Sequence, residues 1–394
     1  MHRPSTLDKS RLDVLIYSHD GRGLGHASRG VTLGMTLRRL FPHLRVLFVS
    51  GCKQTATLIG SCPLEWIKLP SYETEIIGGK AKGRIGDTNL KNCYLGPARA
   101  NIIESIIVNF KPRCVLVDHE PLGKREELLP SLKLTQGTDT IWFLGVRAVI
   151  GEVAGIWSEL SKNIFKEYYH SLFWYGDENI LGPGILDTIE EYFGTRPKAT
   201  GYISRFMEMK NWSSYPSERY AGTVAVPWLS ETSLAFLESL CKALHEIGER
   251  YGRWKIFTDV DHLKKVDNNL KRQFEKISSC IIENVSDQYL GALAHSRVAV
   301  VYGGYNSLTD ILAVNVPAVA VIRSVNDKEQ EEHVYKIIQS RGDQIYALAE
   351  SGISWKKLYE AIEKQLNVEA QGSSQVKLNG AEFTARSIVE ILGL

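Results

Sequence analysis

Two glycine-rich segments, one near each end of this sequence, combine residue types that bind anions and move protons. The first, HDGRGLGH at residues 19–26, has three alternating glycines and ends in His26. The second, GGYNSLTD at residues 303–310, starts with two glycines and ends in Asp310. Glycines let another molecule approach the backbone closely, and a histidine with an ordinary pKa accepts a proton near neutral pH. Both segments therefore indicate chemistry on an anionic substrate.

Each glycine-rich segment is expected to join a buried strand to a helix. The apolar run LDVLIYS (12–18) precedes the first segment, and RVAVVYG (297–303) leads into the second. The unpaired N–H groups and positive dipole end of the following helix suit an anion. The simpler alternative is a tight turn with ordinary polar residues, in which Asn306 caps the second helix. Capping does not account for the clustered glycines, so the functional interpretation is favoured.

Short β-branched runs alternate with longer helical patterns along the whole chain, which is typical of α/β folds with parallel sheets. Strands are predicted at 12–18, 45–51, 114–120 and 140–146, and again at 222–228, 255–260, 279–285, 297–303 and 318–323. The polar segment 209–220 contains Pro216 and is the predicted hinge. We therefore expect two doubly wound domains. Ligands bind such sheets outside the carboxyl ends of their strands, where both glycine-rich segments lie.

Composition excludes several classes of protein. The 394 residues carry a net charge of +2, which gives no sign of a nucleic-acid partner. No apolar run is long enough to cross a bilayer, and the first residues lack the apolar core of a signal peptide. The six cysteines have no metal-binding spacing. We expect a cytoplasmic protein, with peripheral membrane contact left open. An aromatic cluster (Tyr168, Tyr169, Phe173, Trp174 and Tyr175) could form an acceptor or lipid-facing patch, but such clusters are more often core.

Most of the chain, in order, resembles GT-B glycosyltransferases. It is similar to the family of the peptidoglycan N-acetylglucosaminyltransferase (family 28) and to a bacterial group that carries GGYN. The segment ending in His26 resembles the GGxGGH loop of that family, and TGYISR (200–205) resembles its TGNPVR. The segment NVSDQYLGALAHSRVAVVYGG, the spacing from Asp310 to Pro317, and the pair Glu329 and Gln330 agree with its donor domain.

The resemblance implies a set of donor-binding residues in this chain. Arg205 would lie near the donor phosphates, the backbone near Val285 would contact the base, Asp310 would bind the ribose, and Glu329 and Gln330 would contact the sugar. The complete set is Gly23, Gly25, Arg205, Val285, Gly303, Gly304, Tyr305, Asn306, Ser307, Asp310, Glu329 and Gln330.

The base that deprotonates the acceptor is expected on the opposite side of the cleft. His26 is the first candidate, and VDHEPLGKREE (117–127) adds Asp118 and Glu120 at a strand end, where a solvated turn is the competing interpretation. Arg147 follows another strand and would meet an acidic acceptor or lie on the surface. The spacing in TDVDH (258–262) resembles a metal motif of a different transferase architecture but lacks its context, so no metal is expected.

By this resemblance the protein is a metal-independent glycosyltransferase with no bound cofactor. It would transfer a sugar from a UDP-linked donor to a small or lipid-linked acceptor. Residues 1–208 would form the acceptor-side domain, residues 209–378 the nucleotide-sugar domain, and residues 379–394 a helix that crosses back to the first domain. The sequence does not identify the sugar, the acceptor or the stereochemical outcome.

Three departures from the family pattern keep other functions open. The first strand of the donor domain leads into VPWLSET, in which Pro227 and Trp228 stand where glycines are usual. Asp310 is one methylene shorter than the usual glutamate, and Glu329 adds a negative charge near the expected diphosphate. A non-catalytic nucleotide-sugar-binding partner protein and a nucleotide-sugar 2-epimerase are therefore the alternatives.

Overall fold

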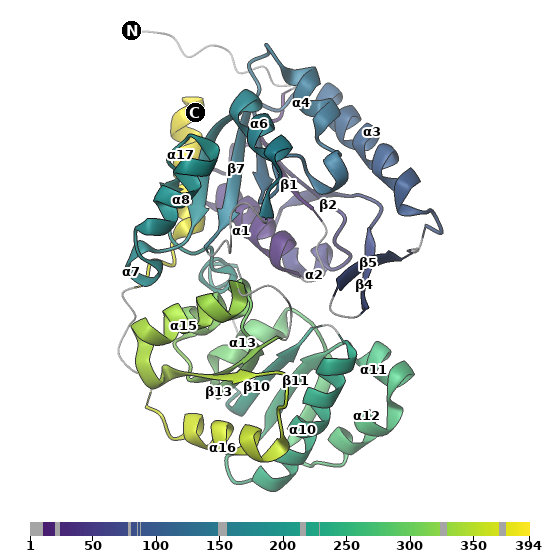
Figure 1. Ribbon diagram of the computed structural model, residues 1–394, viewed down its shortest axis with the longest axis vertical. Coiled ribbons are helices and arrows are strands. Elements are labelled where there is room, and N and C mark those ends of the chain that lie inside the picture. The colour runs from purple at the N-terminus through teal and green to yellow at the C-terminus, as the bar shows by residue number, and fades with distance from the viewer. Residues whose placement is uncertain are drawn as a thin grey trace.

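Two parallel β-sheets flanked by helices organise the chain into two lobes (Figure 1). The computed structural model describes residues 11–19, 24–77, 80–84, 86, 88–148, 156–212, 218–227, 229–323, 329–369 and 376–394. The first lobe is built from the N-terminal half of the chain and from the C-terminal helix. The second lobe is built from residues after 218. This arrangement agrees with the predicted pair of doubly wound domains.

The first sheet has seven strands in the order β3-β2-β1-β6-β7-β8-β9, and all its paired strands are parallel. Its strands are β1 (Val14–Ser18), β2 (Val46–Ser50), β3 (Glu65–Lys68), β6 (Cys114–Asp118), β7 (Ile141–Arg147), β8 (Tyr169–Tyr175) and β9 (Lys198–Ala199). The strand order reverses between β1 and β6. That reversal is the switch point at which open α/β sheets bind ligands.

Helices and a small hairpin complete the first lobe. The helices are α1 (Gly25–Leu40), α2 (Thr55–Ile59), α3 (Asn92–Phe110), α4 (Leu129–Thr135), α6 (Glu159–Tyr168), α7 (Glu178–Leu181), α8 (Gly184–Phe193) and α9 (Arg205–Met209), with a short 3-10 helix at Lys124–Glu126. Strands β4 (Glu73–Ile77) and β5 (Lys80–Arg84) pair antiparallel, apart from the main sheet.

The second sheet has six parallel strands in the order β12-β11-β10-β13-β14-β15. Its strands are β10 (Tyr220–Val226), β11 (Trp254–Thr258), β12 (Cys280–Asn284), β13 (Ser296–Tyr302), β14 (Ala318–Ile322) and β15 (Ile345–Ala349). The helices are α10 (Glu231–Ile247), α11 (Val260–Val266), α12 (Asn268–Glu275), α13 (Gln288–Ala294), α14 (Tyr305–Val314), α15 (Glu329–Arg341) and α16 (Trp355–Leu366), with a 3-10 helix at Gly342–Gln344. The switch point lies between β10 and β13.

All nine predicted strands are confirmed, because continuous apolar, β-branched runs suit strands buried on both faces. Every residue of β1, β2 and β6 is buried, for example. Strands β3, β4, β5, β8, β9 and β15 were not predicted. The aromatic cluster forms β8 and the end of α6. Since Tyr169, Phe173, Trp174 and Tyr175 are buried, the cluster is core and does not form an exposed patch.

The C-terminal helix α17 (Gly380–Leu392) packs against α1 on the first lobe, as predicted, and is the yellow helix beside the upper sheet in Figure 1. Glu382 forms an ion pair with Arg39 of α1 at 2.7 Å. At Gly380 an added Cβ would lie 2.2 Å from the carbonyl oxygen of Gly201. Only glycine permits this close approach, which fixes where the chain returns to the first lobe.

The predicted hinge at 209–220 lies between the end of α9 and the start of β10, and residues 213–217 of it fall outside the described residues. One set of buried apolar side chains runs from the first sheet into α14 and α15 of the second lobe. The lobes therefore share an apolar contact as well as facing one another.

Candidate functional site

A cavity of about 650 Å³ lies between the two lobes, at the carboxyl ends of both sheets. Its volume is within the range of small-molecule sites. The first lobe contributes Leu24, Gly25, His26, Ser28, Arg29, Gln54, Thr57, Leu58, Arg147 and Arg205. The second lobe contributes Ala225, Pro227, Phe257, Val285, Ser286, Tyr289, Tyr302, Gly304, Tyr305, Asn306, Ser307, Asp310, Arg323, Glu329 and Gln330.

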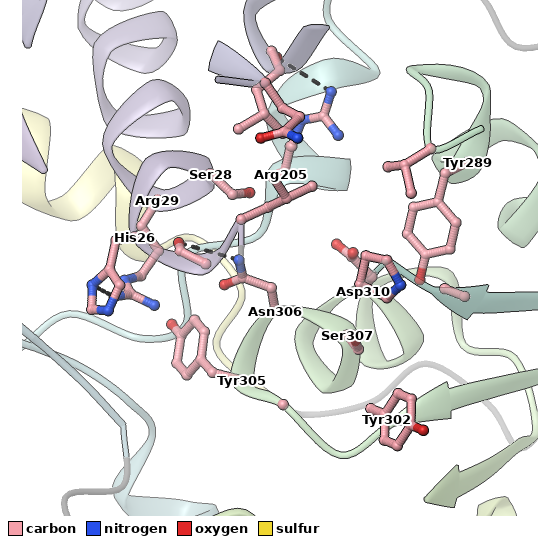
Figure 2. A pocket seen from close by; sticks show the side chains of 18 of the residues that line it. His26, Ser28, Arg29, Arg205, Tyr289, Tyr302, Tyr305, Asn306, Ser307 and Asp310 are labelled. Atoms are coloured by element: carbon pink, nitrogen blue, oxygen red, sulfur yellow. Dashed lines mark hydrogen bonds between the residues drawn. The ribbon is translucent and has the colours of Figure 1, made fainter. Parts of the chain in front are cut away.

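His26 lies in the first turn of α1 and is held by a buried ion pair. Its Nδ1 lies 2.5 Å from Oδ2 of Asp118, the last residue of β6. Arg29, one turn further along α1, donates two hydrogen bonds to the same carboxylate, at 3.0 and 2.9 Å. Figure 2 shows His26 and Arg29 side by side on this helix. Two separate candidates for the base, His26 and Asp118, are thus in contact, and the switch point between β1 and β6 positions both.

The surroundings of His26 determine which ring nitrogen carries the proton. Asp118 is ionised because, although burial favours its neutral form, the Arg29 and His26 neighbours hold its pKa well below the usual range. Two groups approach Nδ1 of His26: Asp118 Oδ2, which only accepts, at 2.5 Å and Arg29 Nη2, which only donates, at 3.0 Å. The shorter contact favours Nδ1 as the donor to Asp118, which leaves Nε2 as the acceptor. Burial, with a smaller contribution from His19, lowers the pKa of His26 to about 3. The imidazole is therefore neutral at pH 7.

Glu120 is not brought to this site. Its carboxylate accepts hydrogen bonds from Ser161 Oγ at 2.9 Å and from the backbone N–H of Leu122 at 3.3 Å. The reason is the backbone of His119, whose φ of 72° turns the chain away directly after β6. A non-glycine residue rarely adopts this conformation. The sequence pattern placed Glu120 on the strand, but the turn removes it from the cavity.

The start of α14 forms the facing wall of the cavity. No side chain caps the start of the helix at Gly304. The N–H of Gly304 itself donates to the carbonyl oxygen of Tyr302 at 2.8 Å, so the N–H groups of Tyr305 and Asn306, at the start of the helix, are the ones left for a ligand. Asn306 does not cap the helix, which was the simpler alternative; its side chain donates across the cleft to the carbonyl oxygen of Gly25 at 3.2 Å. Gly303 lies behind the wall, where an added Cβ would lie 2.6 Å from Val334.

Asp310 lies on this wall, and Arg205 of α9 faces it from the first lobe (Figure 2). The carboxylate of Asp310 is buried, and no hydrogen bond reaches it from any side chain or backbone group that the structure describes. Burial raises its pKa to about 7, although the charge of Arg205 opposes the rise. Arg205 donates to the carbonyl oxygen of Leu58 at 3.2 Å. Such a carboxylate is suited to accept hydrogen bonds from ligand hydroxyls.

Glu329 is paired across the cleft and does not face the cavity as an isolated charge. Arg147, at the end of β7 in the first lobe, forms an ion pair with it. The two side chains are 26% and 10% exposed. Gln330 lines the cavity beside this pair, and its Oε1 is buried without a hydrogen-bond partner among the described residues. The concern that Glu329 repels a diphosphate is therefore reduced, because Arg147 neutralises its charge.

An apolar corner of the cavity surrounds Val285. Tyr289 and Phe257 meet edge to face there, with ring centroids 5.6 Å apart, and Ser286 lies beside them. Of the departures from the family pattern, Pro227 lines the same cavity, whereas Trp228 lies outside the described residues. The corner could hold a flat ring, such as a nucleotide base, against aromatic side chains.

Most of the predicted donor residues share this one cavity. Gly25, Arg205, Val285, Gly304, Tyr305, Asn306, Ser307, Asp310, Glu329 and Gln330 line it, and Gly23 lies outside the described residues. The hydroxyl of Tyr305 points into the first lobe, away from the donor wall, and bonds to Tyr175 O and Ile203 N.

Two arginines of the cavity, Arg29 and Arg323, were missed. Arg29 could have been found from its i+3 spacing to His26, which puts both on one helix face. Arg323 follows β14 and lies over the Tyr302 ring at 3.9 Å. Its position at the end of a predicted strand could have identified Arg323 as a site residue.

The TDVDH segment has a structural role. Asp259 is the N-cap of α11 and accepts from the N–H of His262 at 2.9 Å. Among the residues that the structure describes, no three His, Cys, Asp or Glu side chains are grouped so that they could hold a metal ion. No helix within the described ranges is long and apolar enough to cross a membrane.

Comparison with known proteins identifies the fold. No protein-family model and no curated protein matches the sequence. The UDP-GlcNAc 2-epimerase of Methanocaldococcus jannaschii, solved with UDP-GlcNAc and UDP, has a TM-score of 0.61 at 11% identity, over 96% of this chain and 99% of that one. The kitacinnamycin glycotransferase has a TM-score of 0.57 at 13% identity, over 97% and 96%. MurG of Acinetobacter baumannii has a TM-score of 0.51 at 10% identity, over 97% and 98%. This chain has the GT-B fold, as the sequence resemblance predicted.

Proposed function

We propose that this protein is a glycosyltransferase that moves a sugar from a UDP-linked donor to an acceptor hydroxyl without a metal ion. One observation carries the proposal. One interdomain cavity has His26, held by Asp118, on one wall and the uncapped start of α14 on the other. The first wall can take a proton from an acceptor, and the second can bind the diphosphate of a donor.

The donor would lie along the second lobe. The N–H groups of Tyr305 and Asn306 would bind the diphosphate, because that of Gly304 already donates to Tyr302 O, and Asp310 would accept hydrogen bonds from the ribose. The base would fit the apolar corner beside Val285 and Tyr289. Arg205 and Arg323 line the cavity and would offset the negative charge of the leaving nucleotide.

The acceptor would meet the donor sugar in front of His26. Nε2 of His26 takes the proton of the acceptor hydroxyl, and the acceptor oxygen forms a bond to the anomeric carbon. The bond from that carbon to the diphosphate breaks, and UDP leaves with the electron pair. Asp118 keeps the ring in the tautomer that this step needs and stabilises the imidazolium that forms. Closed lobes would exclude water and limit hydrolysis of the donor.

Metal independence is part of the proposal. The leaving charge is assigned to helix N–H groups and to arginines, so a metal ion has no required role. Turnover should therefore persist when a chelator is added. Loss of turnover on chelation, with recovery on addition of Mg²⁺ or Mn²⁺, would contradict this part of the proposal.

A nucleotide-sugar 2-epimerase is the second candidate, and the TM-score of 0.61 to the archaeal UDP-GlcNAc 2-epimerase favours it. Epimerisation at carbon 2 needs groups that remove and return a carbon-bound proton. The carboxylates that line the cavity within the described residues are Asp310 and Glu329, and Arg147 engages the latter. A non-catalytic binding protein is the third candidate, supported by Pro227 in the donor wall.

Turnover of a panel of nucleotide sugars by the purified protein separates the three candidates. UDP release that depends on an added acceptor, with a new glycoside detected by mass spectrometry, supports transfer. Release of an epimeric nucleotide sugar or its products supports epimerisation. Saturable binding without any product supports the binding protein. Acceptor-independent epimer formation would overturn the proposed transfer.

A further inference from the structure

Tyr305, the tyrosine of the GGYN segment, connects the donor helix to the other lobe. It is the first residue of α14, and only 9% of its surface is exposed. Its hydroxyl accepts a hydrogen bond from the N–H of Ile203 and donates one to the carbonyl oxygen of Tyr175, both at 2.9 Å. Both partners belong to the first lobe. The side chain of Tyr305 therefore extends from the second lobe into the first and lies near α1, as Figure 2 shows.

The ring of Tyr305 covers the ion pair that holds His26. The Arg29 guanidinium lies over this ring, 5.3 Å from its centroid. The same guanidinium makes the two hydrogen bonds to Asp118. Asp118 in turn bonds to Nδ1 of His26. A continuous series of contacts thus runs from the start of the donor helix, through Arg29 and Asp118, to the ring of His26.

We propose that Tyr305 is a positioning residue that makes the His26–Asp118 pair dependent on closure of the two lobes. The proposal rests on the proposed function, because it assigns His26 the role of base. When the lobes are closed, Tyr305 excludes water from Arg29 and Asp118. When the second lobe moves away, Tyr305 moves with it, because it belongs to α14. The base would then be ready only while the donor helix is in place.

Water access is the physical link between Tyr305 and the base. Within the part of the chain that the structure describes, the charged and titratable groups around His26 are His19, Asp118, His119 and Arg29. Burial is the largest cause of the lowered pKa of His26, and its neighbours partly cancel one another. Loss of the covering ring should hydrate the cluster. The pKa of His26 should then rise toward its ordinary value, while its bond to Asp118 becomes weaker and less directional.

A second cross-lobe tyrosine provides a matched control. Tyr202 of the first lobe bonds through its hydroxyl to Nε2 of His333 in α15 at 3.0 Å. Tyr202→Phe removes one hydrogen bond between the lobes without removing the ring over Arg29. Tyr305→Phe removes two hydrogen bonds between the lobes and keeps the ring over Arg29. Tyr305→Leu removes the two hydrogen bonds and the ring. The three variants separate simple adhesion of the lobes from cover of the ion pair.

The test is a pH titration of the His26 ring by NMR of the full-length, ring-labelled protein, with the His26 signal identified as the one absent in His26→Gln. In the natural protein His26 should stay neutral down to at least about pH 5. In Tyr305→Leu the midpoint should rise by at least about one pH unit. Tyr305→Phe should shift less, and Tyr202→Phe should match the natural protein.

An unshifted midpoint in Tyr305→Leu would overturn the proposal. If that variant does not fold, Tyr305→Met, which also lacks the ring, is titrated in its place, and an unshifted midpoint there overturns the proposal. The titration needs no substrate, so it is independent of turnover. If transfer is found, kcat of Tyr305→Leu should fall roughly 10- to 100-fold with nucleotide affinity changed less than about threefold. A natural protein that lacks turnover but shows the shift contradicts only the proposed function.

Discussion

Among single residues, His26 and Asp310 have pKa values shifted in opposite directions. Burial keeps His26 neutral, with a pKa of about 3, and raises the pKa of Asp310 to about 7. A base that is neutral over the whole physiological range does not lose its function through its own protonation. A carboxylate that titrates near neutrality makes ligand binding depend on pH. The two residues can be tested separately, because the protonation state of His26 affects turnover and that of Asp310 affects nucleotide binding.

His26→Gln should lower kcat by roughly 10²–10⁴-fold, the usual contribution of a general base. Nucleotide affinity should change less than about threefold, because the proposed nucleotide contacts lie on the other lobe. In the natural protein, kcat at saturating donor should be nearly constant between about pH 5.5 and 8. Initial rates and calorimetric titrations check both statements. Full activity of the variant would leave the base unidentified and contradict the mechanism.

Asp310→Asn should leave the melting temperature of the ligand-free protein unchanged or raise it. The carboxylate is buried without a hydrogen bond from the described residues, and burial of such a group costs free energy. Nucleotide affinity should nevertheless fall by about 1.5–3 kcal/mol, the range for hydrogen bonds to a charged group. Thermal unfolding and calorimetry test the two effects. A large loss of stability with unchanged affinity would show a structural role instead.

The pH dependence of donor binding follows from the direction of the Asp310 shift. The pKa is about 7 in the folded protein and lies well below that in the unfolded chain, so the folded state holds the extra proton. On this group alone, stability falls as pH rises from about 4 to 7. Ribose binding needs the ionised form, so affinity for a UDP-sugar should fall up to about tenfold per pH unit below 7.

A UDP-sugar is the right probe for this titration, because its esterified diphosphate does not itself titrate near neutrality. The pH dependence should disappear in Asp310→Asn. A dependence that persists in that variant would assign the titration to another group.

At the scale of elements, the sequence predicted the strands better than the turns. The apolar run LDVLIYS predicted β1, because a strand that is buried on both faces of a sheet has apolar residues at nearly every position. Strand β8 was not predicted. Its aromatic residues were interpreted as a cluster, because the sequence does not show that this segment pairs with β7. Helix α14 was predicted from Gly303, Gly304 and the following helical pattern, whereas its uncapped start was not.

The candidate site was predicted only in part, and the reason is backbone geometry. His26 and Asp118 were named as separate candidates, but their contact depends on the parallel pairing of β1 with β6. Glu120 was placed wrongly because nothing in its sequence context indicates the positive φ of His119. Tyr305 was assigned to the donor because the GGYN pattern does not show which lobe its side chain contacts.

At the scale of the whole molecule, the two lobes are joined by specific polar contacts across the cavity. Asn306 bonds to the carbonyl oxygen of Gly25, Tyr202 to His333, and Arg147 to Glu329. The shared apolar contact lies behind them. The structure is therefore a closed arrangement that its own side chains stabilise, in which the acceptor-side base and the donor helix face each other.

Glu329→Ala should destabilise the ligand-free protein by about 1–3 kcal/mol, since it leaves the partly buried Arg147 without its charged partner. Small-angle scattering should also show a more open average shape. Arg196→Ala is the matched control, because that arginine pairs with Asp187 and Glu190 on the surface and should change stability by less than about 0.5 kcal/mol. Equal effects of the two substitutions would show that the cross-lobe pair does not hold the cleft closed.

Nucleotide binding by the second lobe can be measured by calorimetric titration of UDP and UDP-sugars into the natural protein, Asp310→Asn and Asp343→Asn. The last variant removes the same charge from an exposed site of the second lobe. We expect saturable one-to-one binding that Asp343→Asn leaves unchanged and Asp310→Asn weakens by about 1.5–3 kcal/mol. No binding at millimolar nucleotide, or equal affinity in all three proteins, would show that the second lobe is not a nucleotide-sugar site.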